Sequence, residues 1–133
     1  MGQNEDVVRA FSLAVADGKL DRAMNLLGPE FVLDMSGSGA PYRGIYHGPE
    51  GVRKALEEFL DAFKEYTWEP QEMIELGPEL LCVTTRVAGI GKGSGVEVVA
   101  HGAWIYRFRD GQLVHGRLFQ NKQEALAATA EED

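Results

Sequence analysis

A short turn signal near the end of the chain constrains the fold more than any other feature of the sequence. Asp110 and Gly111 lie between two runs, residues 96–109 and 112–120, in which apolar and polar side chains largely alternate. An Asp-Gly pair between alternating runs is typical of a β-hairpin with a two-residue turn. The sequence therefore predicts an antiparallel sheet that includes these strands.

The pairing within this hairpin determines which side chains share a face. With a two-residue turn, strict alternation puts one set on a single face: Trp104, Tyr106, His115, Arg117 and Phe119. This face is mostly apolar, so we expect it to face the core. A buried arginine needs an anion, water or an aromatic ring. Stacking of Arg117 on Trp104 and a place for Arg117 in a ligand pocket remain alternatives. A longer turn would exchange the two faces.

The remaining patterns predict helices first and strands afterwards. Apolar residues at helical spacing indicate helices over residues 4–17, with Asn4 as the cap, and over 20–27 and 49–63. Further strands are predicted over residues 30–36, 67–76 and 80–90, with a loop at 37–48. Asn121 and Glu124 resemble a capping box that opens a last helix. This order predicts an α+β fold with an antiparallel sheet and helices on one face.

Composition and charge argue against several classes of function. The 133 residues, 44% of them hydrophobic, suit a single domain over residues 1–133. A formal net charge of −8 argues against binding to nucleic acid or to an anionic membrane. No apolar run approaches the ~18 residues of a membrane span, and no signal peptide is visible. We therefore expect a cytoplasmic location. The single Cys82 and three histidines suggest no metal site, and we expect no cofactor.

Several stretches of the sequence carry a resemblance to a known family. They are GKLDRAMNLLGPEFVLDMS, YHGPEGVRKALEEF, GKGSGVEV and YRFRDGQLVHGRLFQNKQEAL. In this order they resemble the SnoaL-like branch of the nuclear-transport-factor-like superfamily, which includes ketosteroid isomerase and scytalone dehydratase. The resemblance implies a cone-shaped, curved antiparallel sheet wrapped around N-terminal helices, a cystatin-like α+β barrel. It also implies a pocket between the helices and the concave face, and a homodimer through the outer sheet face.

The resemblance does not extend to the catalytic groups of ketosteroid isomerase. That enzyme uses a tyrosine and a protonated aspartate as oxyanion donors and a second aspartate as general base. The resemblance places Phe11, Met35 and Trp104 at those positions, and all are apolar. Asp34 lies next to the base position, but alternation turns it to the opposite face unless a bulge intervenes. We therefore expect no steroid isomerisation by that mechanism.

The predicted pocket is mostly apolar and has two candidate catalytic residues. The lining expected from the hairpin pairing and the resemblance is Phe11, Leu33, Met35, Tyr46, Leu56, Phe59, Trp104, Tyr106, Arg117 and Phe119. His115 is the candidate general acid or base, because histidine titrates near neutral pH, and Asp34 is the alternative base. The expected function is binding of a mostly apolar or aromatic cyclic molecule, with cofactor-free isomerase, cyclase or lyase activity left open. The alternative is a non-catalytic dimeric interaction or ligand-carrier module with a self-filled cone.

Overall fold

The computed structural model describes residues 2–36 and 44–132. The described chain forms, in order, α1 (Gln3–Ala16), α2 (Leu20–Met24), β1 (Leu27–Asp34), β2 (Ile45–His47), α3 (Gly48–Asp61), β3 (Phe63–Gly77), β4 (Leu80–Gly91), β5 (Glu97–Arg109), β6 (Gln112–Phe119) and α4 (Lys122–Glu132). Within these described residues, no helix is long and apolar enough to cross a membrane. Residues 37–43 of the expected loop lie outside the described residues, and β2 forms in the rest of it.

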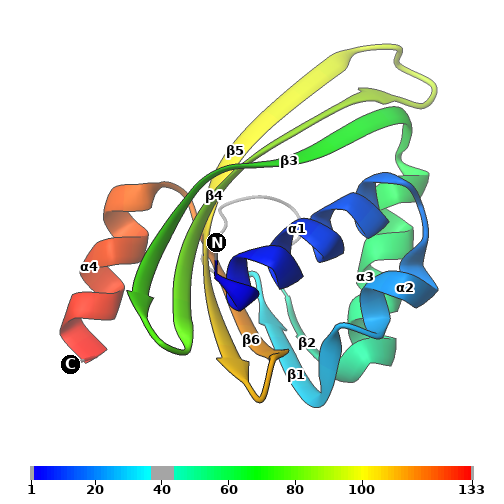
Figure 1. Ribbon diagram of the computed structural model, residues 1–133. Helices are drawn as coiled ribbons and strands as arrows, with labels where there is room; N and C mark the ends of the chain where they lie inside the picture. The colour runs from blue at the N-terminus through cyan, green and yellow to red at the C-terminus, as the bar shows by residue number, and fades with distance from the viewer. Residues whose placement is uncertain (1, 37–43, 133) are drawn as a thin grey trace.

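The strands form one curved sheet around the first three helices. Its strand order is β2-β1-β6-β5-β4-β3. Figure 1 shows α1, α2 and α3 on the concave side, whereas α4 lies on the opposite side. The predicted α+β fold class is therefore confirmed, although α4 does not share a face with the other helices. The β1–β6 pairing is parallel, which the expected antiparallel sheet did not include.

Helix ends agree with the sequence at the last helix and differ at the first. The backbone N–H of Glu124 donates to Oδ1 of Asn121 at 2.9 Å, so the predicted cap of α4 is confirmed. At the first helix, the predicted Asn4 cap is wrong, because α1 begins at Gln3. There the backbone N–H of Gly2 donates to Oε1 of Glu5 at 3.1 Å.

Two strands begin earlier than predicted, and each shortens the helix before it. Leu27, expected to end the second helix, pairs with Leu113 and begins β1. Phe63, expected on the apolar stripe of the third helix, pairs with Gly91 and begins β3. In both places an apolar residue that suits a helix also suits a strand, so sheet pairing decides its conformation.

The hairpin turn is the predicted one. Asp110 and Gly111 have φ angles of 52° and 80°, as a two-residue turn of this type requires. Arg109 pairs with Gln112 as expected. Asp-Gly therefore fixed the position of the turn and the first pair beyond it.

One extra residue in β6 changes every pair farther from the turn. Phe108 pairs with Leu113, but Arg107 pairs with His115, so Val114 is left over as a β-bulge. Beyond the bulge, Trp104 pairs with Leu118 instead of the predicted Arg117. The predicted pairing is therefore wrong from this point, and the two faces of β6 are exchanged relative to β5.

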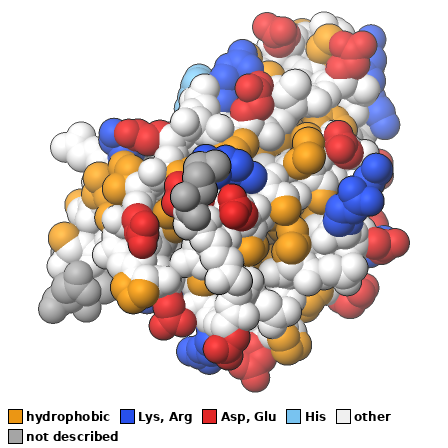
Figure 2. Space-filling model, viewed as in Figure 1, with side chains coloured by type: hydrophobic (Ala, Val, Ile, Leu, Met, Phe, Trp, Pro, Cys, Tyr) orange, Lys and Arg blue, Asp and Glu red, His pale blue; other side chains and the backbone are white. Residues whose placement is uncertain are grey.

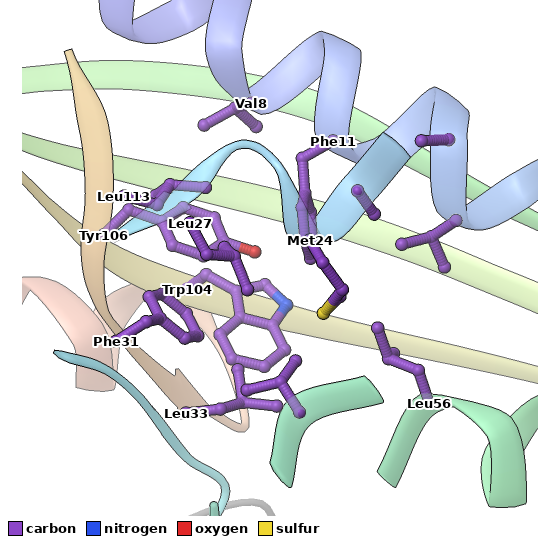
Figure 3. Packing of buried hydrophobic residues seen from close by; sticks show 14 of the residues in the cluster. Val8, Phe11, Met24, Leu27, Phe31, Leu33, Leu56, Trp104, Tyr106 and Leu113 are labelled. Carbon is purple, nitrogen blue, oxygen red and sulfur yellow. The ribbon is translucent and has the colours of Figure 1, made fainter. Parts of the chain in front are cut away.

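The main core lies between the concave sheet face and the helices. Figure 3 shows Phe11 and Met24 from the helices over Leu33, Trp104 and Tyr106 from the strands. A second, smaller cluster lies under α4 on the convex face and contains Cys82, Ala103, Ile105, Phe119 and Ala125. On the surface drawn in Figure 2, acidic and basic side chains are interspersed. The site discussed below belongs to the concave side.

Candidate functional site

A small cavity lies between α3 and the concave face of the sheet. Its volume is about 50 Å³. Its walls are aromatic and aliphatic: Phe11, Leu33, Met35, Tyr46, Val52, Ala55, Leu56, Phe59, Trp68, Trp104 and Tyr106. All the predicted pocket residues except Arg117 and Phe119 line it. Whether they bind a ligand stays a prediction.

An aromatic pair on β5 forms the floor of this cavity. Trp104 and Tyr106 follow one another on the same face, and their rings stack with centroids 5.5 Å apart and planes 6° from parallel. Tyr106 pairs with Gly116 of β6. A Cβ atom at Gly116 would lie only 3.0 Å from the Tyr106 ring. Gly116 therefore lets the tyrosine ring lie close to the β6 backbone.

A second cavity adjoins the first and shares part of its lining. Its volume is about 150 Å³. Thr85, Val87, Ala100, His101, Gly102, Leu118, Phe119 and Gln120 line it, together with Met35, Phe59, Trp68 and Trp104 of the first cavity. Those last side chains therefore stand between the two spaces. Phe119 reaches this second cavity rather than the first.

The structure does not place His115 and Arg117 in the cone. Because of the bulge at Val114, both lie on the convex face, beside Arg107 and under α4. There they line a space of only about 20 Å³, closed by Thr129 and neighbouring residues. The predicted inward direction of these side chains is thus wrong. The physical reason is the one-residue insertion, which reverses alternation without disturbing the turn.

The side chain of Arg117 stacks on an aromatic ring, that of Phe119. Its guanidinium carbon lies 4.6 Å from the centroid of the Phe119 ring, a cation–π contact. The expected aromatic partner was Trp104, which lies on the other face. Among the described residues, no acceptor meets the buried Nε of Arg117. The predicted stacking of Arg117 on Trp104 is therefore wrong, and Phe119 takes the place of that ring.

Asp34 also faces away from the cavity. Leu33 and Met35, its chain neighbours, both line the cavity, whereas Asp34 pairs with Arg117. Burial alone would raise the pKa of its carboxyl. Hydrogen bonds from the Ser36 hydroxyl at 2.6 Å and backbone N–H at 3.0 Å, with the charges of Arg117 and His115, hold that pKa below its usual value. A general base in an apolar pocket requires the opposite shift, so the structure contradicts the inward Asp34.

The cavity wall therefore offers neutral groups only. Among the described residues that line it, none carries an ionised side chain. Phe11, Met35 and Trp104, at the positions of the isomerase catalytic groups, all lie on this wall. Burial raises the pKa of the Tyr106 hydroxyl well above its usual range, so this group stays protonated. Tyr106 can donate a hydrogen bond, and it does not act as a base near neutral pH.

The sequence analysis missed Val52, Ala55 and Trp68 as lining residues. Val52 and Ala55 belong to the apolar stripe of the third helix, two turns and one turn before Phe59, and were not assigned to the pocket. Trp68 pairs with Val87 on the concave side of β3 and β4. Trp68 lies in a predicted strand with alternating side chains, but the sequence did not show which face of that strand meets the cone. In the described part of the chain, no three His, Cys, Asp or Glu side chains gather to hold a metal ion.

The predicted homodimer through the outer sheet face stays a prediction. At one end of that face α4 covers Ala103 and Ile105, which are buried. The other end of the β4–β5 hairpin extends beyond α4 (Figure 1). Val98 and Val99, near the start of β5, are 45% and 42% exposed.

Comparisons with solved structures agree on the fold. An NTF2-like protein of unknown function from Burkholderia pseudomallei is 22% identical, with a TM-score of 0.76, and the match covers 96% of this chain and 97% of that one. RV0760c from Mycobacterium tuberculosis, in complex with estradiol-17beta-hemisuccinate, is 15% identical, with a TM-score of 0.77 and coverage of 92% and 97%. TerC, co-crystallised with polyporic acid, is 16% identical, with a TM-score of 0.75 and coverage of 98% and 99%.

The sequence comparison identifies the family. No curated protein matches the chain. The sequence model of the SnoaL-like domain matches residues 8–116, from the middle of α1 to β6. This span contains the concave face, the cavity wall and the bulge described above. The chain therefore belongs to the family of proteins with a SnoaL-like domain.

Proposed function

We propose that this chain binds an uncharged, mostly apolar ring compound in the cone, and that it does so without acid–base catalysis. One observation carries the proposal: the cavity wall is aromatic and aliphatic, whereas His115, Asp34 and Arg117 lie on the convex face. Flat aromatic walls such as Trp104 and Phe59 suit the faces of ring compounds.

The uncharged lining of the cavity favours a neutral ligand over an ionised one. An ionised group inside an apolar cavity costs several kcal/mol unless a protein group pairs with it. The described lining offers no such group. A general acid or base must also lie within hydrogen-bond reach of the reacting atoms. The protonated hydroxyl of Tyr106 can orient a ligand, so binding without proton transfer fits the wall better than catalysis does.

Ligand entry requires side chains to move. Pockets for small organic ligands usually measure about 300–1,000 Å³, far more than the 50 Å³ found between α3 and the sheet. The adjoining 150 Å³ space lies behind Met35, Phe59, Trp68 and Trp104. Met35 is unbranched, with a flexible thioether side chain that can repack around a ligand. The alternative, a cone filled permanently by its own side chains, predicts no binding.

Two structural neighbours support a ring compound as the ligand class. TerC was co-crystallised with polyporic acid and RV0760c with estradiol-17beta-hemisuccinate, and both compounds contain rings. Their sequence identities to this chain are low, so these neighbours support a ring compound as the ligand class and do not name the ligand. The neutral character of the ligand rests on this chain's own cavity wall.

The proposal is tested by binding of an uncharged bicyclic hydrocarbon. Purified protein is first examined by native mass spectrometry for a co-purified small molecule. Indane is then titrated into the ¹⁵N-labelled protein, and backbone amide shifts are followed by NMR. We expect saturable shifts in α3, β1 and β5. Ala55→Leu places a larger side chain in the cavity and should weaken binding about tenfold or more.

A matched substitution controls for effects outside the cavity. Ala127 is an exposed position in α4, so Ala127→Leu makes the same chemical change far from the cone. Its indane affinity should equal that of the wild type. Absence of saturable shifts in the wild type, or equal affinity in Ala55→Leu, would show that the cone is not the binding site.

A further inference from the structure

The two cavities of the cone are separated by a small group of side chains that we call the partition: Met35, Phe59, Trp68 and Trp104. Each of these residues lines both spaces, whose volumes are about 50 and 150 Å³. Neither volume reaches the size usual for an organic ligand. A ring compound in the cone therefore has to displace part of the partition and join the two spaces.

The partition contains a polar atom that the described residues leave unsatisfied. The indole N–H of Trp68 is buried and, among the described residues, meets no hydrogen-bond acceptor. The ring of Phe59 lies 5.8 Å from the Trp68 ring at an interplanar angle of 81°. This edge contact packs the indole and supplies no oxygen or nitrogen lone pair. Buried donors without acceptors are rare in native proteins, because each forfeits the hydrogen bond it makes with water.

We propose that Trp68 determines the ligand specificity of the cone by donating its indole N–H to a carbonyl oxygen of the ligand. The inference rests on the proposed function, because it concerns the same cavity and requires a ring compound to enter it. Entry displaces the partition, and the same movement uncovers the indole N–H. The preferred ligand is therefore an uncharged ring compound that carries a carbonyl group.

The chemistry of the wall favours a carbonyl over other oxygen groups. An indole N–H only donates, so its partner must be an acceptor. A carboxylate would bring a charge, and no Lys or Arg side chain of the described residues lines either cavity. A hydroxyl would bring a donor of its own, which needs a further acceptor in a mostly apolar wall. A ketone oxygen accepts the hydrogen bond from Trp68 and brings neither a charge nor a donor of its own.

The test compares indane with 1-indanone, in which a ketone replaces one ring CH₂ group. Both compounds are titrated into the wild type and into Trp68→Phe by NMR. In the wild type, 1-indanone should bind at least as tightly as indane. In Trp68→Phe the ketone keeps its desolvation cost and loses its donor, so its affinity relative to indane should fall about tenfold. Changes in cavity shape affect both compounds alike, so they leave the ratio of the two affinities unchanged.

Trp104→Phe provides the matched control, because it removes the other indole of the partition and keeps Trp68. The ratio of the two affinities should stay at the wild-type value in this variant. The wild type gives a second readout that does not depend on any variant folding. The chain has two tryptophans, hence two indole N–H signals. The Trp68 signal should move downfield with 1-indanone and stay nearly unchanged with indane.

The outcomes separate this inference from the proposed function. If neither compound binds, the proposed function fails. If both bind and the affinity ratio is the same in Trp68→Phe as in the wild type, the cone binds ring compounds but Trp68 is not the donor, and the inference is overturned. Loss of the ketone preference in Trp104→Phe instead would assign the donor to Trp104 and also overturn it. An unmoved Trp68 signal at saturation with 1-indanone leads to the same conclusion.

Discussion

A methyl group added at Gly116 tests the aromatic floor of the cone directly. Gly116 lies opposite Tyr106 in the β5–β6 pair, with Leu33 of β1 on its other side. A Cβ atom there would lie 3.0 and 3.1 Å from two carbons of the Tyr106 ring and 3.4 Å from the ring of Phe31. Because Tyr106 stacks on Trp104, any shift of its ring is passed on to the cavity wall.

The expected cost follows from these contacts. The Tyr106 ring has to give by a few tenths of an ångström in a packed core, and overpacking of this kind costs about 1–3 kcal/mol. Replacement of a strand glycine by alanine recovers about 0.5 kcal/mol through the unfolded chain. We therefore expect Gly116→Ala to lower the free energy of unfolding by about 0.5–2.5 kcal/mol. The matching fall in Tm is about 2–10 °C for a chain of this length.

The assay is urea unfolding followed by tryptophan fluorescence, with Gly77→Ala as control. A Cβ atom at Gly77 would meet nothing within 4 Å, so that variant should be as stable as the wild type or slightly more stable. In a Tyr106→Leu background the added methyl no longer meets the tyrosine ring, so its cost should fall by more than half. Equal costs in the two backgrounds, or a fully stable Gly116→Ala, would refute the close-contact explanation.

Two further predictions concern ionisable groups outside the cone. Because folding holds the pKa of Asp34 below its unfolded value, the ionised carboxylate stabilises the fold above about pH 4, and this contribution is lost as the pH falls through the folded pKa. Asp34→Asn should therefore be less stable than the wild type near neutral pH, and the difference should shrink as the pH falls below about 4; a difference independent of pH in urea unfolding would contradict this. Burial of Cys82 raises the pKa of its thiol, so the thiol should react with Ellman's reagent far more slowly in the native protein than in guanidinium, and equal rates would show that the thiol is accessible.

Local sequence patterns predicted the elements and most of the cavity wall. Asp110-Gly111 specifies its turn through backbone angles that glycine adopts without strain, so the position of the hairpin did not depend on the rest of the fold. Helical spacing on α3 placed Leu56 and Phe59 on the face that meets the sheet. The SnoaL-like family was also recognised from the sequence, and the family match over residues 8–116 confirms it.

The features that the sequence did not predict depend on contacts between distant segments. The parallel β1–β6 pairing joins strands separated by most of the chain and leaves no local pattern. The bulge at Val114 did leave a trace: strict alternation required a histidine and an arginine on an apolar face. Phe119 concealed it, because this residue appeared to continue the core face and is instead buried under α4. Trp68 was missed because alternation in its strand does not show which of the two faces meets the cone.

The bulge at Val114 makes the inner surface of the cone depend on strand register as well as on the identity of its side chains. If Val114 entered the ladder opposite Arg107, His115 would lie opposite Tyr106 and Arg117 opposite Trp104, and both would face the cavity. A slip of one residue in this strand would then bring two basic side chains into an apolar cavity without any substitution. Deletion of Val114 itself would keep His115 opposite Arg107. For the evolution or redesign of such a cone, a one-residue shift of register beyond the bulge therefore changes the ligand class more abruptly than a point mutation does.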